Sequence, residues 1–113
     1  MNKNIDLVNY YFELSNNSNI WEIEKLFTKS STYNSKNTGL YLWVGNIIKM
    51  QKEFHWWFKK LNWEIIEIKE IKENIVKIDF KFDWIKKSWE NILWWWIETI
   101  IVFENKIQHI EIN

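Results

Sequence analysis

The feature that most constrains the fold of this chain is an unbroken alternation of apolar and charged residues between Val76 and Trp84. The apolar positions are Val76, Ile78, Phe80, Phe82 and Trp84, and Lys77, Asp79, Lys81 and Asp83 lie between them. Successive side chains of a β-strand point to opposite faces of its sheet, so this pattern predicts a strand with one buried and one solvated face.

The residues before this strand predict its hairpin partner. If Glu73 and Asn74 form a tight turn, two apolar pairs and one pair of opposite charges come into register. These pairs are Ile71 with Val76, Ile65 with Phe82, and Glu70 with Lys77. Residues 91–103 and 106–112 predict a second hairpin about Glu104 to Lys106, in which His109 lies opposite Ile101.

The first half of the chain has the periodicity of helices. Apolar residues at spacings of three and four between Ile5 and Leu14 predict an amphipathic helix that ends in the Asn- and Ser-rich stretch 15–19. Asn19 is predicted to cap a second, short helix, with Glu22 in the capping-box position. Residues 28–43 predict one or two short strands around a turn at 37–39. Asn46 is predicted to cap a third helix, whose buried stripe is Ile47, Met50, Phe54, Phe58 and Leu61.

This order of elements predicts a single α+β domain over residues 1–113, with about three helices against one face of a curved antiparallel sheet. Net charge is zero, so no basic footprint for nucleic acid is present. The chain has no Cys and two widely spaced His, which predicts no metal site and no cofactor. Without an apolar run of about 18 residues or a signal peptide, we expect a soluble, cytoplasmic protein with no membrane partner.

Several segments resemble the nuclear transport factor 2-like superfamily, also called SnoaL-like or ketosteroid-isomerase-like. They are "YYFELSNN", "IEKLFT" with "STY", "TGLYLWVGNIIKMQKEF", "LNWEIIEIKEIKENIVKIDFKF" and "IETIIVFENKIQHIEIN". The resemblance implies a cone-shaped, cystatin-like fold with a pocket between sheet and helices, and frequent dimers. Members of the superfamily include isomerases, dehydratases, cyclases, epoxide hydrolases and binding modules without catalysis.

The ten tryptophans are the other unusual feature, because the chain has only two glycines where typical usage of roughly 7% predicts about eight. Trp43 lies where the superfamily commonly has glycine, and Trp89 would form a Ser-Gly turn dipeptide if it were glycine. Trp84 is predicted to lie with Trp89 in the loop "FDWIKKSWEN", where glycine would form an Asp-Gly turn dipeptide, and Trp96 lies where a small residue is common in such proteins. We therefore predict that these four are UGA codons of a lineage that reads UGA as glycine. The alternative is that the protein is rich in tryptophan.

Six residues are candidates for chemistry. Glu98 interrupts apolar positions, so it is predicted either to pair with a Lys or to be a pocket acid with a raised pKa. His109 and Asp79 are candidate acid–base groups, although an exposed sheet face or a dimer interface explains both as well. Tyr33 and Tyr41 lie near the pocket mouth that the resemblance implies and could orient a ligand oxygen. Trp63 is a candidate wall of that pocket.

Two hypotheses follow. In the first, the domain binds a small apolar organic molecule, and Glu98, His109 or Asp79 performs acid–base catalysis of the isomerase, dehydratase or cyclase type. In the second, it is a non-catalytic binding or assembly module that forms a homodimer through the sheet face of Lys77, Asp79, Lys81 and Asp83. The substrate and the reaction stay open at this stage.

Overall fold

The predicted alternating strand forms, next to the edge strand of a six-stranded sheet. The computed structural model describes residues 2–113, and their elements are α1 (Lys3–Asn16), α2 (Ile20–Glu24), β1 (Phe27–Ser35), β2 (Gly39–Tyr41), α3 (Val44–Trp56), β3 (Phe58–Lys72), β4 (Ile75–Lys86), β5 (Asn91–Phe103) and β6 (Lys106–Ile112). The strands form one sheet in the order β2-β1-β6-β5-β4-β3. The pair β1 and β6 is parallel and all other pairs are antiparallel.

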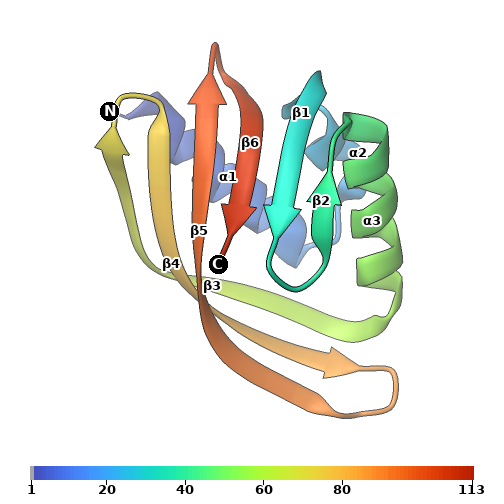
Figure 1. Ribbon diagram of the computed structural model, residues 1–113. Coiled ribbons are helices and arrows are strands. Elements are labelled where there is room, and N and C mark those ends of the chain that lie inside the picture. Colours follow the sequence, from blue (N-terminus) through green and yellow to red (C-terminus); the bar gives the residue numbers. More distant parts are fainter. Residues whose placement is uncertain (1) are drawn as a thin grey trace.

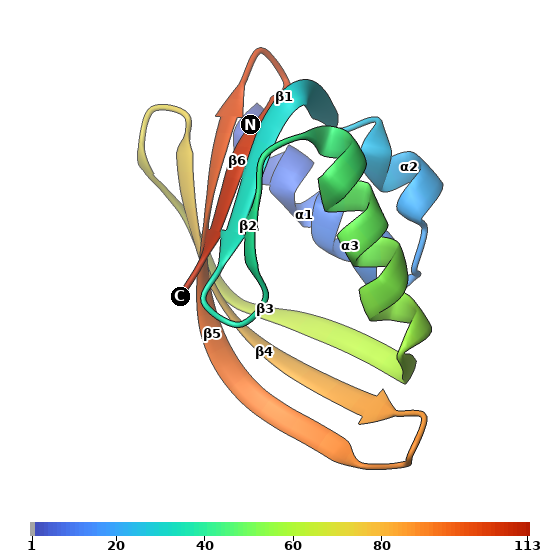
Figure 2. The ribbon, with the colours of Figure 1, turned by 45° about the vertical axis from the view of Figure 1, so that its right-hand side comes forward.

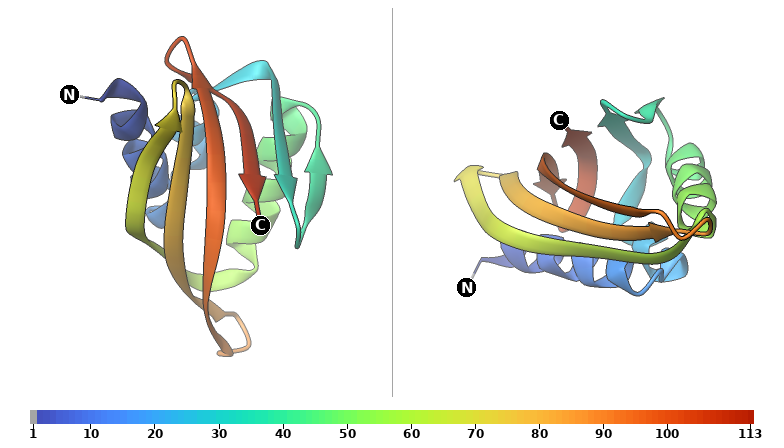
Figure 3. Two further views of the ribbon diagram at one scale, coloured as in Figure 1. Left: turned by 60° about the vertical axis from the view of Figure 1, so that its left-hand side comes forward. Right: turned by 90° about the horizontal axis from the view of Figure 1, so that it is seen from below.

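The sheet is strongly curved, and the three helices lie on its concave face (Figures 1 and 2). The long strands β3, β4 and β5 extend past the helices and curl beneath α3, whereas the outer face of the sheet stays uncovered (Figure 3). The predicted α+β class, with helices against one face of a curved sheet, is therefore confirmed. Both predicted hairpins form, and the second has the predicted strand bounds.

The predicted register of the first hairpin is wrong away from its turn. Lys72 pairs with Ile75 about the predicted turn, but Glu70 pairs with Val76 and Ile65 with Phe80. Irregularities between Glu70 and Lys72 and between Ile65 and Glu67 shift the register by two residues. Such β-bulges bend a strand and increase its twist, which is what a sheet needs to curl around helices.

The shifted register gives Glu70 a structural role. Its carboxylate accepts hydrogen bonds from the side chains of Asn2 (2.6 Å) and Asn4 (2.9 Å) and from the backbone of Asn74 (2.8 Å). The bonds from Asn4, Asn2 and Asn74 lower the pKa of Glu70. They connect the start of α1 to the turn between β3 and β4.

The first two helices begin at polar caps, and the third helix differs from the sequence prediction. Asn2 caps α1, and Asn19 caps α2 by accepting from the backbone of Glu22, as predicted. Helix α3 starts at Val44, so Asn46 lies inside it and caps nothing. It ends at Trp56, so Phe58 and Leu61 belong to β3 instead of the helical stripe. Within residues 2–113, no helix combines the length and the apolar content that crossing a membrane requires.

The core lies between the concave face and the helices. Its fully buried side chains alternate along the strands as the period of two predicts, and β4 contributes Val76 and Ile78. The other fully buried apolar residues are Val8, Ile23, Ile47, Ile100, Val102, Ile107 and Ile110. A cavity lies beside Glu98 in the same space between sheet and helices.

The turn between β4 and β5 supports the glycine hypothesis at one position. Trp89 has φ +69° and donates its backbone N–H to Lys86 O at 2.8 Å, while Lys86 N–H donates to Glu90 O. This is a three-residue hairpin loop whose left-handed residue is commonly glycine. The Trp89 side chain is 69% exposed, so packing does not explain a large residue there.

We expect Trp89→Gly to be more stable than Trp89→Ala by about 1 kcal/mol, because only glycine adopts the left-handed conformation without steric cost. Both variants lose the contact of Lys59 Nζ with the Trp89 ring, so that contact cancels in the comparison. The matched control is Trp21 in α2, also exposed, where alanine should be more stable than glycine. Urea unfolding of the four variants measures both differences. The same order at both positions would contradict the argument.

Candidate functional site

A cavity of about 140 Å³ opens between the concave face of the sheet, α1 and α3. Strands β1, β4 and β5 contribute Tyr33, Phe80, Phe82, Trp84, Trp96 and Glu98, and β3 contributes Trp63. The helices contribute Tyr11, Phe12, Ser15, Met50, Gln51, Phe54 and His55, and the remaining wall is Ser35, Asn37, Thr38 and Ile112. The lining is mostly aromatic, with a small number of polar groups, as is common for small-molecule sites.

Glu98 is the acidic group of this cavity. It lies on the inner face of β5, between Ile78 of β4 and Ile112 of β6, and only 4% of it is exposed. Its Oε2 atom has no hydrogen-bond partner, and burial raises its pKa to about 8. Of the two predicted alternatives, an ion pair with Lys or a raised pKa, the structure therefore has the second.

Two buried tyrosines lie near Glu98. Burial, and secondarily the charge of Glu98, raise the pKa of Tyr11 above its ordinary value. Burial also raises the pKa of Tyr33, with further contributions from Tyr11, Glu98 and Tyr41. Both hydroxyls therefore stay protonated and can donate hydrogen bonds at neutral pH. Tyr33 was predicted, whereas Tyr11 was missed because it belongs to the apolar stripe of α1.

Gln51 was also missed, although the sequence held a signal. It lies three and four residues after Ile48 and Ile47, on the buried side of α3, where a polar side chain needs a partner. Its Nε2 donates to the Tyr11 hydroxyl at 3.1 Å, and its Oε1 is buried without a partner.

His55 of α3 is a further residue that lines the cavity. It follows Phe54 on α3, its ring packs 5.6 Å from the Trp63 ring, and its Nδ1 lies 2.9 Å from Ser18 Oγ. Burial lowers its pKa to about 4, so the imidazole is neutral at pH 7. It can therefore act as a neutral hydrogen-bonding group beside a ligand.

Two of the predicted tryptophan positions form walls of this cavity. Trp84 lies within β4, paired with Ile92, instead of in the predicted loop. Its ring stacks on Phe82 at 4.0 Å and contacts the rings of Phe54 and Trp63 at 4.9 and 5.4 Å. Trp96 lies beside Phe82 with nearly parallel rings. The predicted wall residue Trp63 lines the same cavity.

The other predicted acid–base residues do not line the cavity. Asp79 alternates with Ile78 and Phe80, so it lies on the outer face of β4. His109 pairs with Ile101, as predicted, but this pair also lies on the outer face.

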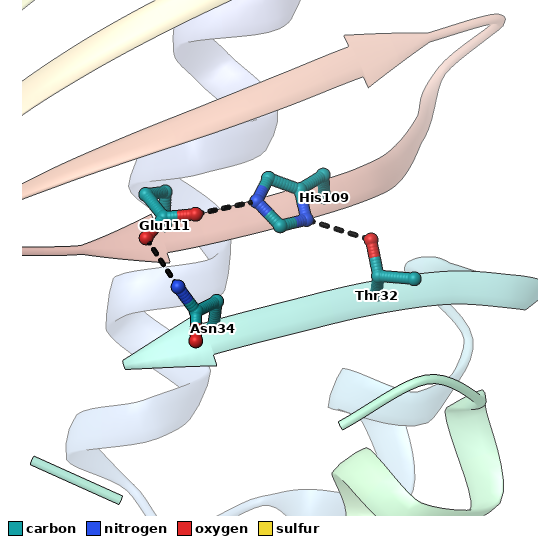
Figure 4. A network of polar contacts seen from close by, with 4 residues as sticks. All are labelled: Thr32, Asn34, His109 and Glu111. Carbon is teal, nitrogen blue, oxygen red and sulfur yellow. Dashed lines mark hydrogen bonds and ion pairs between the residues drawn. The ribbon is translucent and has the colours of Figure 1, made fainter. Parts of the chain in front are cut away.

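There His109 contacts Thr32 Oγ1 through Nδ1 at 2.6 Å and Glu111 through Nε2 at 3.0 Å, and Glu111 accepts from Asn34 (Figure 4). Tyr41 packs against Tyr33 at 6.1 Å, but its hydroxyl donates to Thr38 O. Of the predicted residues, Glu98, Tyr33 and Trp63 are therefore brought together, and Asp79, His109 and Tyr41 are not.

Comparison with known proteins identifies the fold. No family model and no curated protein matches the sequence. Among solved structures, a nuclear transport factor 2-like protein of unknown function from Burkholderia pseudomallei K96243 is similar, with a TM-score of 0.89 and 8% identity over 100% of this chain and 91% of that one.

A hypothetical protein with a ketosteroid isomerase-like fold from Catenulispora acidiphila DSM 44928, in complex with trimethylamine, has a TM-score of 0.86 and 12% identity over 95% and 83% of the two chains. An epoxide hydrolase from M. tuberculosis, described as LEH-like, has a TM-score of 0.82 and 11% identity over 97% and 80%. The chain therefore has the nuclear transport factor 2-like fold that its sequence resembles.

Proposed function

We propose that this domain binds a small organic molecule in the cavity beside Glu98 and that Glu98 transfers a proton to or from that molecule. The observation that carries the proposal is the buried Glu98 carboxyl without a hydrogen-bond partner, in a cavity that is lined mainly by aromatic rings. A buried carboxyl without a partner costs stability, so a ligand that supplies the partner would offset this cost.

The chemistry follows from the pKa of Glu98. At pH 7 a carboxyl group with a pKa of about 8 is mostly protonated and can donate to a carbonyl oxygen. Because this pKa is close to neutral, the same group can also take a proton back, as acid–base catalysis of an isomerase, dehydratase or cyclase requires. Tyr33 is proposed to orient the ligand oxygen, and Trp63 to form the wall on which the ligand packs. The Glu98 carboxyl needs no cofactor for this proton transfer.

Indole N–H signals of the protein test the proposal. Trp84 and Trp96 line the cavity, whereas Trp21 is 73% exposed and serves as an internal control. Titration with phenol, followed in two-dimensional NMR spectra, should shift the Trp84 and Trp96 signals with one saturating curve and leave Trp21 unchanged. Shifts that are equal at all three residues, or no shifts, would count against a ligand site.

A second candidate function is a homodimeric assembly module, and the outer face of β5 favours it. Five apolar residues of this face are 36–54% exposed, namely Leu93, Trp95, Ile97, Ile101 and Phe103. Four of β4's charged residues, two Lys and two Asp, lie beside them. An apolar stripe next to balanced charges can pair with a second copy of itself, because each Lys can meet an Asp across a twofold axis.

For this candidate, sedimentation equilibrium should give twice the chain mass at high protein concentration. Ile97→Lys places a positive charge in the apolar stripe, beside the two Lys of β4, and should shift the equilibrium to monomers. Glu24→Lys, at an exposed position of α2 on the opposite side of the sheet, makes a larger change in charge and is the control. A strict monomer at high concentration would exclude this function. With either candidate function, we propose that the protein is cytoplasmic.

A further inference from the structure

The polar atoms that lack partners are not scattered through the molecule. Within residues 2–113, the buried side-chain atoms without a hydrogen bond are Gln51 Oε1, Trp84 Nε1, Trp96 Nε1 and Glu98 Oε2. All four belong to residues that line the cavity. Glu98 and Gln51 are 4% and 6% exposed, so water reaches neither of them freely. Buried polar groups in folded proteins almost always have hydrogen-bond partners. The hydrogen-bonding capacities of these four atoms therefore indicate which groups a ligand would need.

The four atoms differ in hydrogen-bonding capacity. The two indole N–H groups can only donate, and Gln51 Oε1 can only accept. Glu98, protonated at neutral pH, can donate as well. A complementary ligand needs an oxygen that accepts from the donor groups and a separate O–H that donates to Gln51.

The charge of the lining restricts the ligand further. The residues that line the cavity include no Lys and no Asp, and the chain has no Arg. The two titratable side chains other than tyrosine are His55 and Glu98, and burial keeps both neutral at pH 7. A carboxylate or phosphate would find no counter-charge here, and burying an unpaired charge is unfavourable. The ligand therefore carries no negative charge.

The volume of the cavity limits the number of rings. An apolar cavity of about 150 Å³ in another protein holds one benzene molecule. The present cavity, about 140 Å³, therefore has room for one six-membered ring with small substituents.

We infer that the ligand of this cavity is a compound without negative charge, with one six-membered ring that carries both a carbonyl oxygen and a hydroxyl group. The carbonyl oxygen accepts from the indole N–H groups and the Glu98 carboxyl, and the hydroxyl donates to Gln51 Oε1. The ring packs between the aromatic walls. This inference rests on the proposed function, since it specifies the ligand of the same site. It applies to the alternative in which positions 84 and 96 are tryptophan, because glycine would supply neither indole N–H.

Isothermal titration calorimetry at pH 6.5 with four probe compounds tests the inference. 3-Hydroxyacetophenone has the inferred features, 3-hydroxybenzoate adds a charge, toluene lacks polar groups, and 6-hydroxy-2-acetylnaphthalene adds a ring. We expect 3-hydroxyacetophenone to bind at least tenfold more tightly than each of the others. Binding of toluene or of the two-ring compound with equal or higher affinity would overturn the inference and leave the proposed function standing. No binding by any probe would overturn both.

Variants locate the hydrogen bonds. Trp84→Phe and Trp96→Phe remove one indole N–H each and keep an aromatic ring, and each should weaken 3-hydroxyacetophenone binding three- to tenfold without weakening toluene binding. Trp21→Phe, at an exposed position, should change neither. Two cavity variants allow the result to stand if one of them folds poorly. An equal effect on both compounds would show that the indole groups only pack, and would overturn the inferred contacts.

Discussion

The Glu98→Gln variant is expected to be more stable than the unchanged protein at pH 9 by roughly 5 kcal/mol, and equally stable near pH 4.5. Glutamine has nearly the shape of a protonated glutamate and cannot ionise. In the unchanged protein the pKa of Glu98 is about 8 in the folded state and 4.5 in an ordinary environment. Between these values the unfolded chain loses a proton that the folded protein keeps, so the free energy of unfolding falls as pH rises.

The titration of His55 limits the pH range in which the effect of Glu98 on stability can be measured. Its pKa is lowered from 6.5 to about 4, so between these values the unfolded chain binds more protons and the free energy of unfolding rises with pH. The two slopes oppose one another between pH 4.5 and 6.5. Above pH 6.5 only the effect of Glu98 remains, at about 1.4 kcal/mol per pH unit until its pKa is reached.

Urea unfolding between pH 6.5 and 9 measures the difference. The unchanged protein should lose about 2 kcal/mol between pH 6.5 and 8, whereas Glu98→Gln should stay nearly constant. Glu67→Gln, at an exposed position of β3, should keep the slope of the unchanged protein. If Glu98→Gln kept that slope as well, Glu98 would not be the buried acid of this cavity.

Replacement of Trp84 by glycine has the second large expected effect, a loss of roughly 3–5 kcal/mol of unfolding free energy. The Trp84 ring contacts the rings of Phe54, Phe58, Trp63 and Phe82, with centroids 4.0–5.4 Å away. Its removal leaves a void that these rings cannot fill, and glycine adds flexibility to β4. Thermal and urea unfolding measure the loss, and Trp89→Gly in the neighbouring turn provides the contrast.

The two replacements also bear on how the gene is translated. If UGA encodes glycine at both positions, the protein should tolerate glycine at each of them. A Trp84→Gly variant as stable as the unchanged protein would contradict the packing argument and favour glycine there. Peptide mass spectrometry of the protein from its own organism, over residues 41–57 and 82–100, identifies the residues directly.

The strands were predictable from sequence because strand periodicity is local. The bounds of β5 and β6 follow from apolar runs and a turn, and the inner face of β4 follows from strict alternation. The register of β3 was not predictable from alternation, because bulges shift it. Ile65 and Ile66, two adjacent apolar residues, were the sequence signal of the break.

The site residues could be predicted from sequence only in part, because the pattern of β5 does not distinguish its two faces. Glu98 was identified because it interrupts apolar positions of that strand. His109 was placed opposite Ile101, and this pairing is correct. However, β5 has large apolar residues on both faces, from Trp94 to Trp96 and again at Ile100 and Ile101. Its pattern therefore does not indicate which face the helices cover.

The sequence by itself determined the α+β class, both hairpins and one buried acid, because each depends on spacings within a few turns of chain. Only the tertiary structure decided that Tyr11, Gln51 and His55 line one cavity with Glu98, and that Asp79 and His109 lie on the outer face. The curl of the sheet and the placement of α1 and α3 bring together residues more than 40 positions apart. Contacts over such distances depend on packing and leave no period in the sequence.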